Sequence, residues 1–261
     1  MKNGTVLSSR PLPSSRPNVH LFHVTYVSQE MPVMGYLAFP AAIQKRLPSI
    51  IYCRGGIHRV GMVQISWIEH LALQGFAVFA PSYRGNEGGE GRDDFGGEDR
   101  QDVYAAIDLM SSLPFTDEKR MATIGFSRGG IGALLALAER TEIKAAVSWG
   151  GVADLHQTYL ERDDLRRMLK RVVGHPAKNA GDYLYRSPLH YAGSFHGPVL
   201  IIHGKLDHQV GVIQAEKLAQ RLESLGKPFE YWLYPRYDHH FPHAAHYSCL
   251  SLAARWIGQA F

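Results

Sequence analysis

Residues 120–140 read RMATIGFSRGGIGALLALAER, and this stretch decides the fold. Its first part, Arg120–Phe126, is a short apolar run of the kind that forms a buried strand. Its last part, Gly129–Arg140, is rich in alanine and leucine at helical spacing. Only Ser127 and Arg128 separate the two parts. The sequence therefore predicts a strand that turns sharply into a helix at Ser127.

The same alternation of strand and helix continues on both sides of this stretch. Short apolar runs predict strands at 49–53, 76–80, 120–126, 143–149, 198–203 and 229–234. Amphipathic spacing predicts helices at 64–74, 98–112, 129–140, 212–225 and 244–259. Such alternation is typical of βαβ units, so we expect an α/β fold with a mostly parallel sheet and helices on both faces.

Three segments depart from this alternation. Residues 20–28 and 33–39 alternate apolar and polar side chains around a Gln29–Pro32 turn, which predicts an N-terminal antiparallel hairpin and about eight strands in all. Residues 1–18, rich in Ser, Pro and Arg, are expected to form an irregular N-terminal arm. Residues from about 151 to 196 are too long for a plain connection and predict a small cap insertion. We expect one domain over residues 1–261.

Composition excludes several classes of protein. A hydrophobic content of 45% with 20% charged residues is ordinary for a globular chain, which argues against disorder, collagen and coiled coil. The net charge of +4 forms no one-signed basic stripe, so no nucleic-acid partner is expected. No apolar run is long enough for a membrane span, and residues 1–20 lack a signal-peptide core. Two cysteines make no disulfide framework, so we expect a cytoplasmic protein; its edge strands and arm leave a homo-oligomer open.

The residues around Ser127 have the pattern G-x-S-x-G, completed by Gly125 and Gly129. Between a strand and a helix this pattern predicts a nucleophile elbow, because glycine at both positions removes the Cβ clash of a very tight turn. The helix N-terminus behind the serine favours developing negative charge.

A nucleophilic serine needs a base, and the base needs an acid that orients it. In an open α/β sheet such groups lie beyond the carboxyl ends of strands. Asp207 follows the strand at 198–203, while His239 and His240 follow the strand at 229–234. The order Ser, Asp, His fits this architecture. Spacing alone does not separate His239 from His240.

Two later motifs are more specific than the elbow. Ser187-Pro188, the run Pro198–Gly204, Asp207 and Val210 look like an S-P…P-x-L-x-x-H-G-x-x-D-x-x-V signature, and Tyr234-Pro235 through Phe241 looks like Y-P-x-x-x-H-x-F. With these motifs the chain, from about Ile50 to its C-terminus, resembles the α/β-hydrolase fold and within it the catalytic domain of the prolyl oligopeptidase (S9) peptidase family. The resemblance implies Ser127 as nucleophile, Asp207 as acid and His239, two residues before Phe241, as base.

An oxyanion hole is the next requirement of this chemistry. One donor is expected to be the backbone N–H of Arg128, which follows the nucleophile. The second is expected from Gly56 or Ile57 in the loop after the strand at 49–53. Many relatives have His-Gly-Gly in this loop, and here Arg54 stands in place of the histidine.

Four further side chains near the expected sheet edge are candidates for substrate binding: Arg54, Tyr83, Arg84 and Trp149. Each has a structural alternative. Arg84, in an Arg-Gly pair typical of the family, orients substrate or instead forms an ion pair with Asp99 or Asp102, and the ion pair is favoured. Packing is the favoured alternative for Tyr83 and Trp149.

The resemblance implies a serine hydrolase that forms an acyl-enzyme and cleaves short peptides. A carboxylesterase acting on small acyl esters is the alternative, because both reactions are acyl transfers and 261 residues leave no room for the β-propeller of larger members. A non-catalytic binding module fits less well, since every triad member is present. No cofactor or metal is expected, because the spacing of the C-terminal histidines resembles no H-E-x-x-H motif: His239, His240, His243 and His246.

Overall fold

A single nine-stranded sheet organises the computed structural model, which describes all residues from 1 to 261. Its strands are β1 (Val6–Leu12), β2 (Val19–Ser28), β3 (Met31–Pro40), β4 (Leu47–Cys53), β5 (Ala77–Pro81), β6 (Thr116–Phe126), β7 (Ile143–Trp149), β8 (Val199–Gly204) and β9 (Phe229–Tyr234). The helices are α1 (Ile65–Leu73), α2 (Arg100–Ser112), α3 (Gly129–Glu139), α4 (Leu155–Glu161), α5 (Arg166–Val172), α6 (Ala180–Tyr185), α7 (Ile213–Ser224) and α8 (His243–Gln259). None of the helices combines the length and the apolar character needed to cross a membrane.

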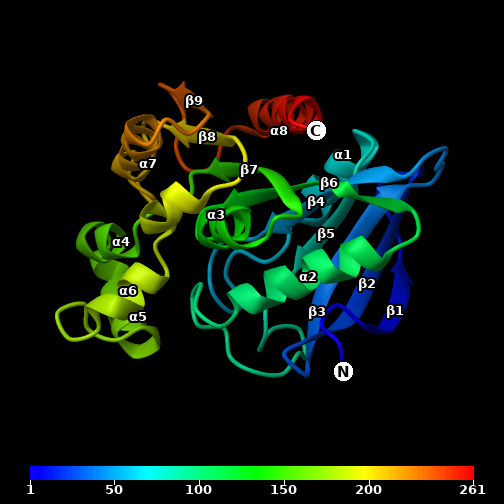
Figure 1. Cartoon of the computed structure of the whole chain (residues 1–261), viewed down its shortest axis with the longest axis horizontal. Helices are drawn as coiled ribbons and strands as arrows, with labels where there is room; N and C mark the ends of the chain where they lie inside the picture. The colour runs from blue at the N-terminus through cyan, green and yellow to red at the C-terminus, as the bar shows by residue number, and fades with distance from the viewer.

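The strand order is β1-β2-β3-β5-β4-β6-β7-β8-β9 (Figure 1). The first strands pair antiparallel, including β3 with β5, and all pairs from β5 through β4 to β9 are parallel. The predicted parallel sheet with an N-terminal antiparallel hairpin is therefore confirmed. The carboxyl ends of β4, β6, β7, β8 and β9 meet at one edge, which is where the chemistry of such folds lies.

Helices cover both faces of the sheet because its central strands are apolar on both sides. Alternate residues of β4 enter different cores: Ile51 packs with α2, α3 and α7, whereas Ile50 packs with α1 and α8. In β8 the same alternation places Ile201 and Leu200 on opposite faces. This two-residue period is what a strand requires and explains the continuous apolar runs in the sequence.

The predicted irregular arm is wrong in part, because residues 6–12 form the edge strand β1. It pairs antiparallel with β2 from Val6 opposite Tyr26 to Leu12 opposite Leu21, so the sheet has nine strands rather than about eight. The predicted four-residue turn before β3 is also shorter than expected. Gln29 and Glu30 alone connect the strands, both with positive φ (48° and 67°), as a two-residue hairpin turn of primed type requires.

The stretch predicted as a cap consists of short helices. It contains α4, α5 and α6 with two 3-10 helices, Asp163–Leu165 and Pro188–Ser194. In Figure 1 the three α-helices lie together at one end of the molecule, beside α3. A third apolar core joins them to α3 through Tyr159, Leu169 and Tyr183 on the cap side and Ile131 and Leu135 on the helix.

Candidate active site

Ser127 lies on a sharp turn between β6 and α3, as the sequence predicts. Its φ is +57°, in the left-handed region that non-glycine residues rarely adopt. A side chain on Gly125 would overlap the carbonyl oxygen of Gly129, and one on Gly129 would overlap that of Cys53. The two glycines of the motif therefore allow the backbone crossing that forces Ser127 out of the sheet.

Asp207 and His239 contact each other beyond the ends of β8 and β9. Asp207 Oδ2 lies 2.7 Å from His239 Nδ1, and both side chains are buried. Asp207 Oδ1 accepts from the backbone N–H groups of Gln209 and Val210, at 2.8 Å each. Because an ionised carboxylate only accepts, Nδ1 of His239 carries the proton and Nε2 is left as an acceptor. The adjacent His240 makes no such contact with Asp207, so the geometry distinguishes the two histidines.

Two residues beside this pair are ones that the sequence analysis missed. A Cβ on Gly150 would lie 3.2 Å from His239 Nδ1 and 3.3 Å from Asp207 Oδ2, and its φ is +49°. His203 Nε2 donates to the carbonyl of Val210 at 2.8 Å and lies 3.5 Å from Asp207 Oδ2. The signals were the glycine pair after β7 and the His-Gly pair that ends β8, but neither reveals a neighbour by sequence alone.

A cavity of about 500 Å³ brings Ser127, Arg128, His239 and His240 together. It is bounded by the loop before α1, by the cap and by the loops after β6, β8 and β9. Half of its lining residues are hydrophobic, among them Ile57, Phe95, Val152, Leu165, Met168 and Val210. No carboxylate lines it. At its margin Arg162 is already paired with Asp164, at 2.7 and 2.8 Å.

The predicted oxyanion donors border this cavity. A Cβ on Gly55 would lie 2.9 Å from Ser127 Cβ, so the loop after β4 runs directly beside the nucleophilic position. The backbone N–H groups of Arg128, Gly56 and Ile57 make no hydrogen bond within the chain. All three residues line the cavity. The structure thus brings the predicted donors to the predicted nucleophile.

The four side chains predicted to bind substrate do not line the cavity, and this corrects that prediction. Arg54, Tyr83, Arg84 and Trp149 are at most 5% exposed. Arg54 donates to the carbonyl of Ser82 and accepts, through its own carbonyl, the hydroxyl of Tyr83. Trp149 packs among aromatic rings of the core. The structural alternative holds for each of them.

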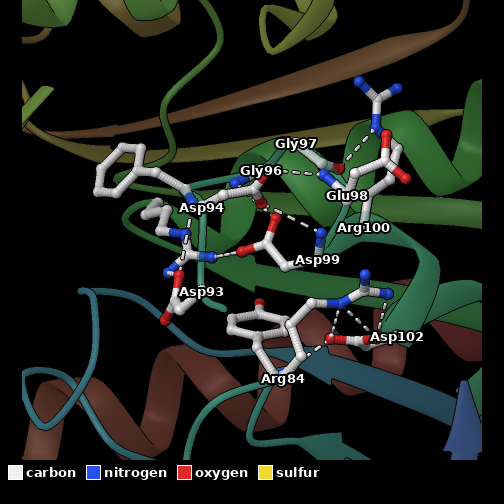
Figure 2. A network of polar contacts seen from close by, with 12 residues as sticks. Arg84, Asp93, Asp94, Gly96, Gly97, Glu98, Asp99, Arg100 and Asp102 are labelled. Atoms are coloured by element: carbon white, nitrogen blue, oxygen red, sulfur yellow. Dashed lines mark hydrogen bonds and ion pairs between the residues drawn. The ribbon is translucent and has the colours of Figure 1, made fainter. Parts of the chain in front are cut away.

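Arg84 illustrates that alternative. Its Nε and Nη2 donate to Asp102 at 2.8–3.2 Å, and Figure 2 shows this pair below a second group of acidic side chains, which includes Asp93 and Asp99. Those two carboxylates bind the guanidinium of Arg128. Burial alone would lower the pKa of Arg128, but Asp99 and Asp93 outweigh it and raise that pKa, so Arg128 is charged.

His246, one of the C-terminal histidines, lies in the core between Trp67 and Trp149, with ring centroids 4.0 and 4.5 Å away. Burial lowers its pKa to about 4 from an ordinary value of 6.5, and its Nε2 has no partner. The folded state therefore binds fewer protons than the unfolded chain between these values, and stability falls as the pH falls from 6.5 toward 4.

We expect this histidine to make the protein sensitive to acid. Between pH 7 and pH 4.5 its titration should remove about 2–3 kcal/mol of the free energy of unfolding. A His246→Phe variant keeps a ring between the two tryptophans and should lose less over the same interval by that amount. Urea unfolding of both proteins at the two pH values measures the difference. Equal losses in both would contradict the assignment.

Comparisons with known proteins place the chain in a family. The sequence model of the Prolyl oligopeptidase family matches residues 63–261. The "Uncharacterized peptidase YtmA" of Bacillus subtilis is 41% identical and covers 97% of this chain and 98% of its own length. Dipeptidyl-peptidase 5 of Porphyromonas gingivalis is 28% identical over 75% of this chain, which spans only 31% of that protein.

Solved structures agree with these matches. A puromycin-hydrolyzing peptidase of Mycobacterium tuberculosis superposes with a TM-score of 0.78 at 27% identity, covering 88% of this chain and 37% of that one. The acylaminoacyl peptidase of Pyrococcus horikoshii superposes with a TM-score of 0.81 at 22% identity, covering 94% and 42% respectively, and supports the fold. The resemblance read from the sequence is confirmed: the chain belongs to the prolyl oligopeptidase family of serine peptidases, peptidase family S9, and has the α/β-hydrolase fold.

Proposed function

We propose that this peptidase cleaves short peptides through an acyl-enzyme, with Ser127 as nucleophile, His239 as base and Asp207 as the acid that orients the base. The observation that carries the proposal is the 2.7 Å contact between His239 Nδ1 and Asp207 Oδ2 beside a cavity that also contains Ser127. The arrangement meets the requirement of serine catalysis that the base be held in one tautomer.

The reaction follows from these positions. Ser127 Oγ attacks the carbonyl carbon of the scissile bond, and His239 Nε2 takes the hydroxyl proton. The carbonyl oxygen becomes negative and is stabilised by backbone N–H groups at Arg128 and at Gly56 or Ile57. Collapse of this intermediate breaks the C–N bond, and the amine leaves with the proton from His239. Water then attacks the acyl-enzyme with the same base and regenerates Ser127.

The cavity supports a small substrate with an apolar acyl side. Its volume of about 500 Å³ suits a short peptide, and its apolar residues from the cap and the loops are suited to an uncharged side chain. Because no carboxylate lines it, nothing in the cavity is placed to bind a free amino group. The names of the relatives, which describe peptidases, agree with a peptide substrate.

The test compares an N-acylated amino-acid anilide with the matched ester, each corrected for the rate of the Ser127→Ala variant. We expect kcat/KM for the anilide within about tenfold of that for the ester, a difference of about 1.4 kcal/mol in barrier, because His239 is held to protonate a poor amine leaving group. Turnover of the ester alone would contradict the peptide part of the proposal and favour a carboxylesterase.

A further inference from the structure

Two buried arginines hold the loop that runs beside Ser127. Arg54 begins this loop and Arg128 follows the nucleophile in sequence, and their side chains are 1% and 3% exposed. The loop between them, residues 55–61, has no regular secondary structure of its own. Its shape must therefore come from side-chain contacts.

Arg54 closes the loop around its guanidinium. Nη1 donates to the carbonyl of Gly55 at 3.0 Å and to that of Val60 at 3.2 Å. Nε and Nη2 donate to the carbonyl of Ser82, just after β5, at 3.1 and 2.9 Å. One rigid, planar group thus ties both ends of the loop to the neighbouring strand.

Arg128 holds the next carbonyl of the loop. Its Nη1 donates to Gly56 O at 2.7 Å and lies 2.8 Å from Asp93 Oδ1. The other oxygen of Asp93 lies 3.5 Å from Arg54 Nη2 and accepts the backbone N–H of His58 at 3.2 Å. Asp93 is fully buried and so acts as the shared counter-ion of both arginines.

These contacts fix two peptide planes. In a planar trans peptide the C=O of one residue and the N–H of the next point in opposite directions. A bond to the carbonyl of Gly55 therefore sets the direction of the Gly56 N–H, and a bond to the carbonyl of Gly56 sets that of the Ile57 N–H. Both N–H groups have no acceptor within the chain, and the loop touches Ser127 at Gly55.

We propose that Arg54, Asp93 and the side chain of Arg128 are positioning residues, which aim the backbone N–H groups of Gly56 and Ile57 at the oxyanion. They touch no substrate, since Arg54 and Asp93 lie outside the cavity and the guanidinium of Arg128 is committed to Gly56, Asp93 and Asp99. The inference rests on the proposed function, because an oxyanion forms only if Ser127 attacks a carbonyl.

The test is the kinetics of Arg54→Met and Arg54→Lys with the anilide or the ester. Loss of a whole oxyanion donor lowers kcat by about 10²–10³. A donor that is present but no longer aimed should cost less, so we expect kcat to fall about 10- to 100-fold in Arg54→Met with KM within about threefold. Lysine keeps the charge beside Asp93 but cannot bond the carbonyls of Gly55 and Ser82 together, so Arg54→Lys should also lose kcat, to a smaller extent.

A matched control and an inhibitor separate positioning from loss of stability. Arg84→Met removes an equally buried arginine that contacts Asp102 and not the loop; it should lower stability and leave kcat within about threefold. A peptide boronic acid, which forms a tetrahedral adduct on the serine, should bind the Arg54 variants more weakly by about the factor lost in kcat/KM. Urea unfolding first establishes that each variant is folded at the assay temperature.

The outcomes divide as follows. Activity in Ser127→Ala would overturn the proposed function itself. An inactive Ser127→Ala together with wild-type kcat in a folded Arg54 variant would overturn the positioning role alone, as would an equal kcat loss in Arg84→Met or a change confined to KM. If Arg54→Met does not fold, Arg54→Lys decides by the same criteria.

Discussion

Alanine in place of Ser127 is expected to lower kcat by about 10⁴- to 10⁶-fold on any substrate that the wild-type protein turns over. Without the hydroxyl there is no acyl-enzyme, and His239 has no nucleophile from which to take a proton. The residual rate comes from the oxyanion donors and from binding alone. Steady-state kinetics, with protein free of wild-type carry-over, measures the loss.

The fold should tolerate this change. The side chain of Ser127 makes no hydrogen bond within the chain, and the elbow is held by its backbone, with Ser127 N donating to the carbonyl of Trp149 at 3.0 Å. We expect the melting temperature to stay within about 2 °C, since surface-like substitutions that break no contact stay within about 0.5 kcal/mol.

A double variant, Ser127→Ala with His239→Ala, provides the internal control. If the two residues act as one unit, the double variant should be no slower than either single variant, because each alone already removes the mechanism. Independent, multiplying losses would contradict a shared nucleophile and base. A Ser127→Ala protein with substantial activity would mean that another group attacks the substrate.

The elbow and the triad could be predicted because their signals are local. Gly125 and Gly129 flank Ser127 within five residues, and Asp207 and His239 each follow an apolar run that ends at a sheet edge. The parallel topology then brings these ends together without further information. The family motifs also distinguished His239 from His240, and its contact with Asp207 agrees.

The substrate side chains were predicted poorly because sequence position does not tell which way a side chain points. Arg54 follows β4 at the correct edge, yet it is buried, and arginine is seldom fully buried unless paired. Its carboxylate partner, Asp93, lies 39 residues away in the sequence, so the pairing is visible only in three dimensions. Trp149, likewise at a strand end, turns into the core.

The strand β1 was missed for a related reason. All of its residues except the last are exposed, so the segment lacks the alternation that marks a half-buried strand. Its strand conformation comes from hydrogen bonding to β2, a tertiary contact, rather than from its own hydrophobic pattern. Exposed edge strands of this kind are where pattern-based prediction has least to work with.

Removal of the Asp102 carboxylate is expected to cause the largest loss of stability. Asp102 is fully buried; it accepts from Ser28 Oγ at 2.7 Å, from the backbone N–H of Arg84 at 2.7 Å and from the Arg84 guanidinium at 2.8–3.2 Å. Asp102→Ala leaves that guanidinium buried without its counter-ion, which should cost about 3–5 kcal/mol. Urea unfolding at pH 7 measures it. As an exposed control, Asp117→Ala, which breaks the pair with Arg120, should cost less than about 1 kcal/mol.

The same pair should be dispensable when both members are replaced. Burial raises the pKa of Asp102 above its ordinary value even though Arg84 and Ser28 donate to it, so desolvation is not fully offset by the pairing. An Arg84→Met, Asp102→Leu double variant removes both charges and fills the space with apolar atoms. It should regain most of the stability lost in Asp102→Ala, as buried ion pairs replaced by apolar groups commonly do. A double variant as unstable as Asp102→Ala would instead show that the remaining bonds to Ser28 and to the Arg84 backbone carry the stability of this site.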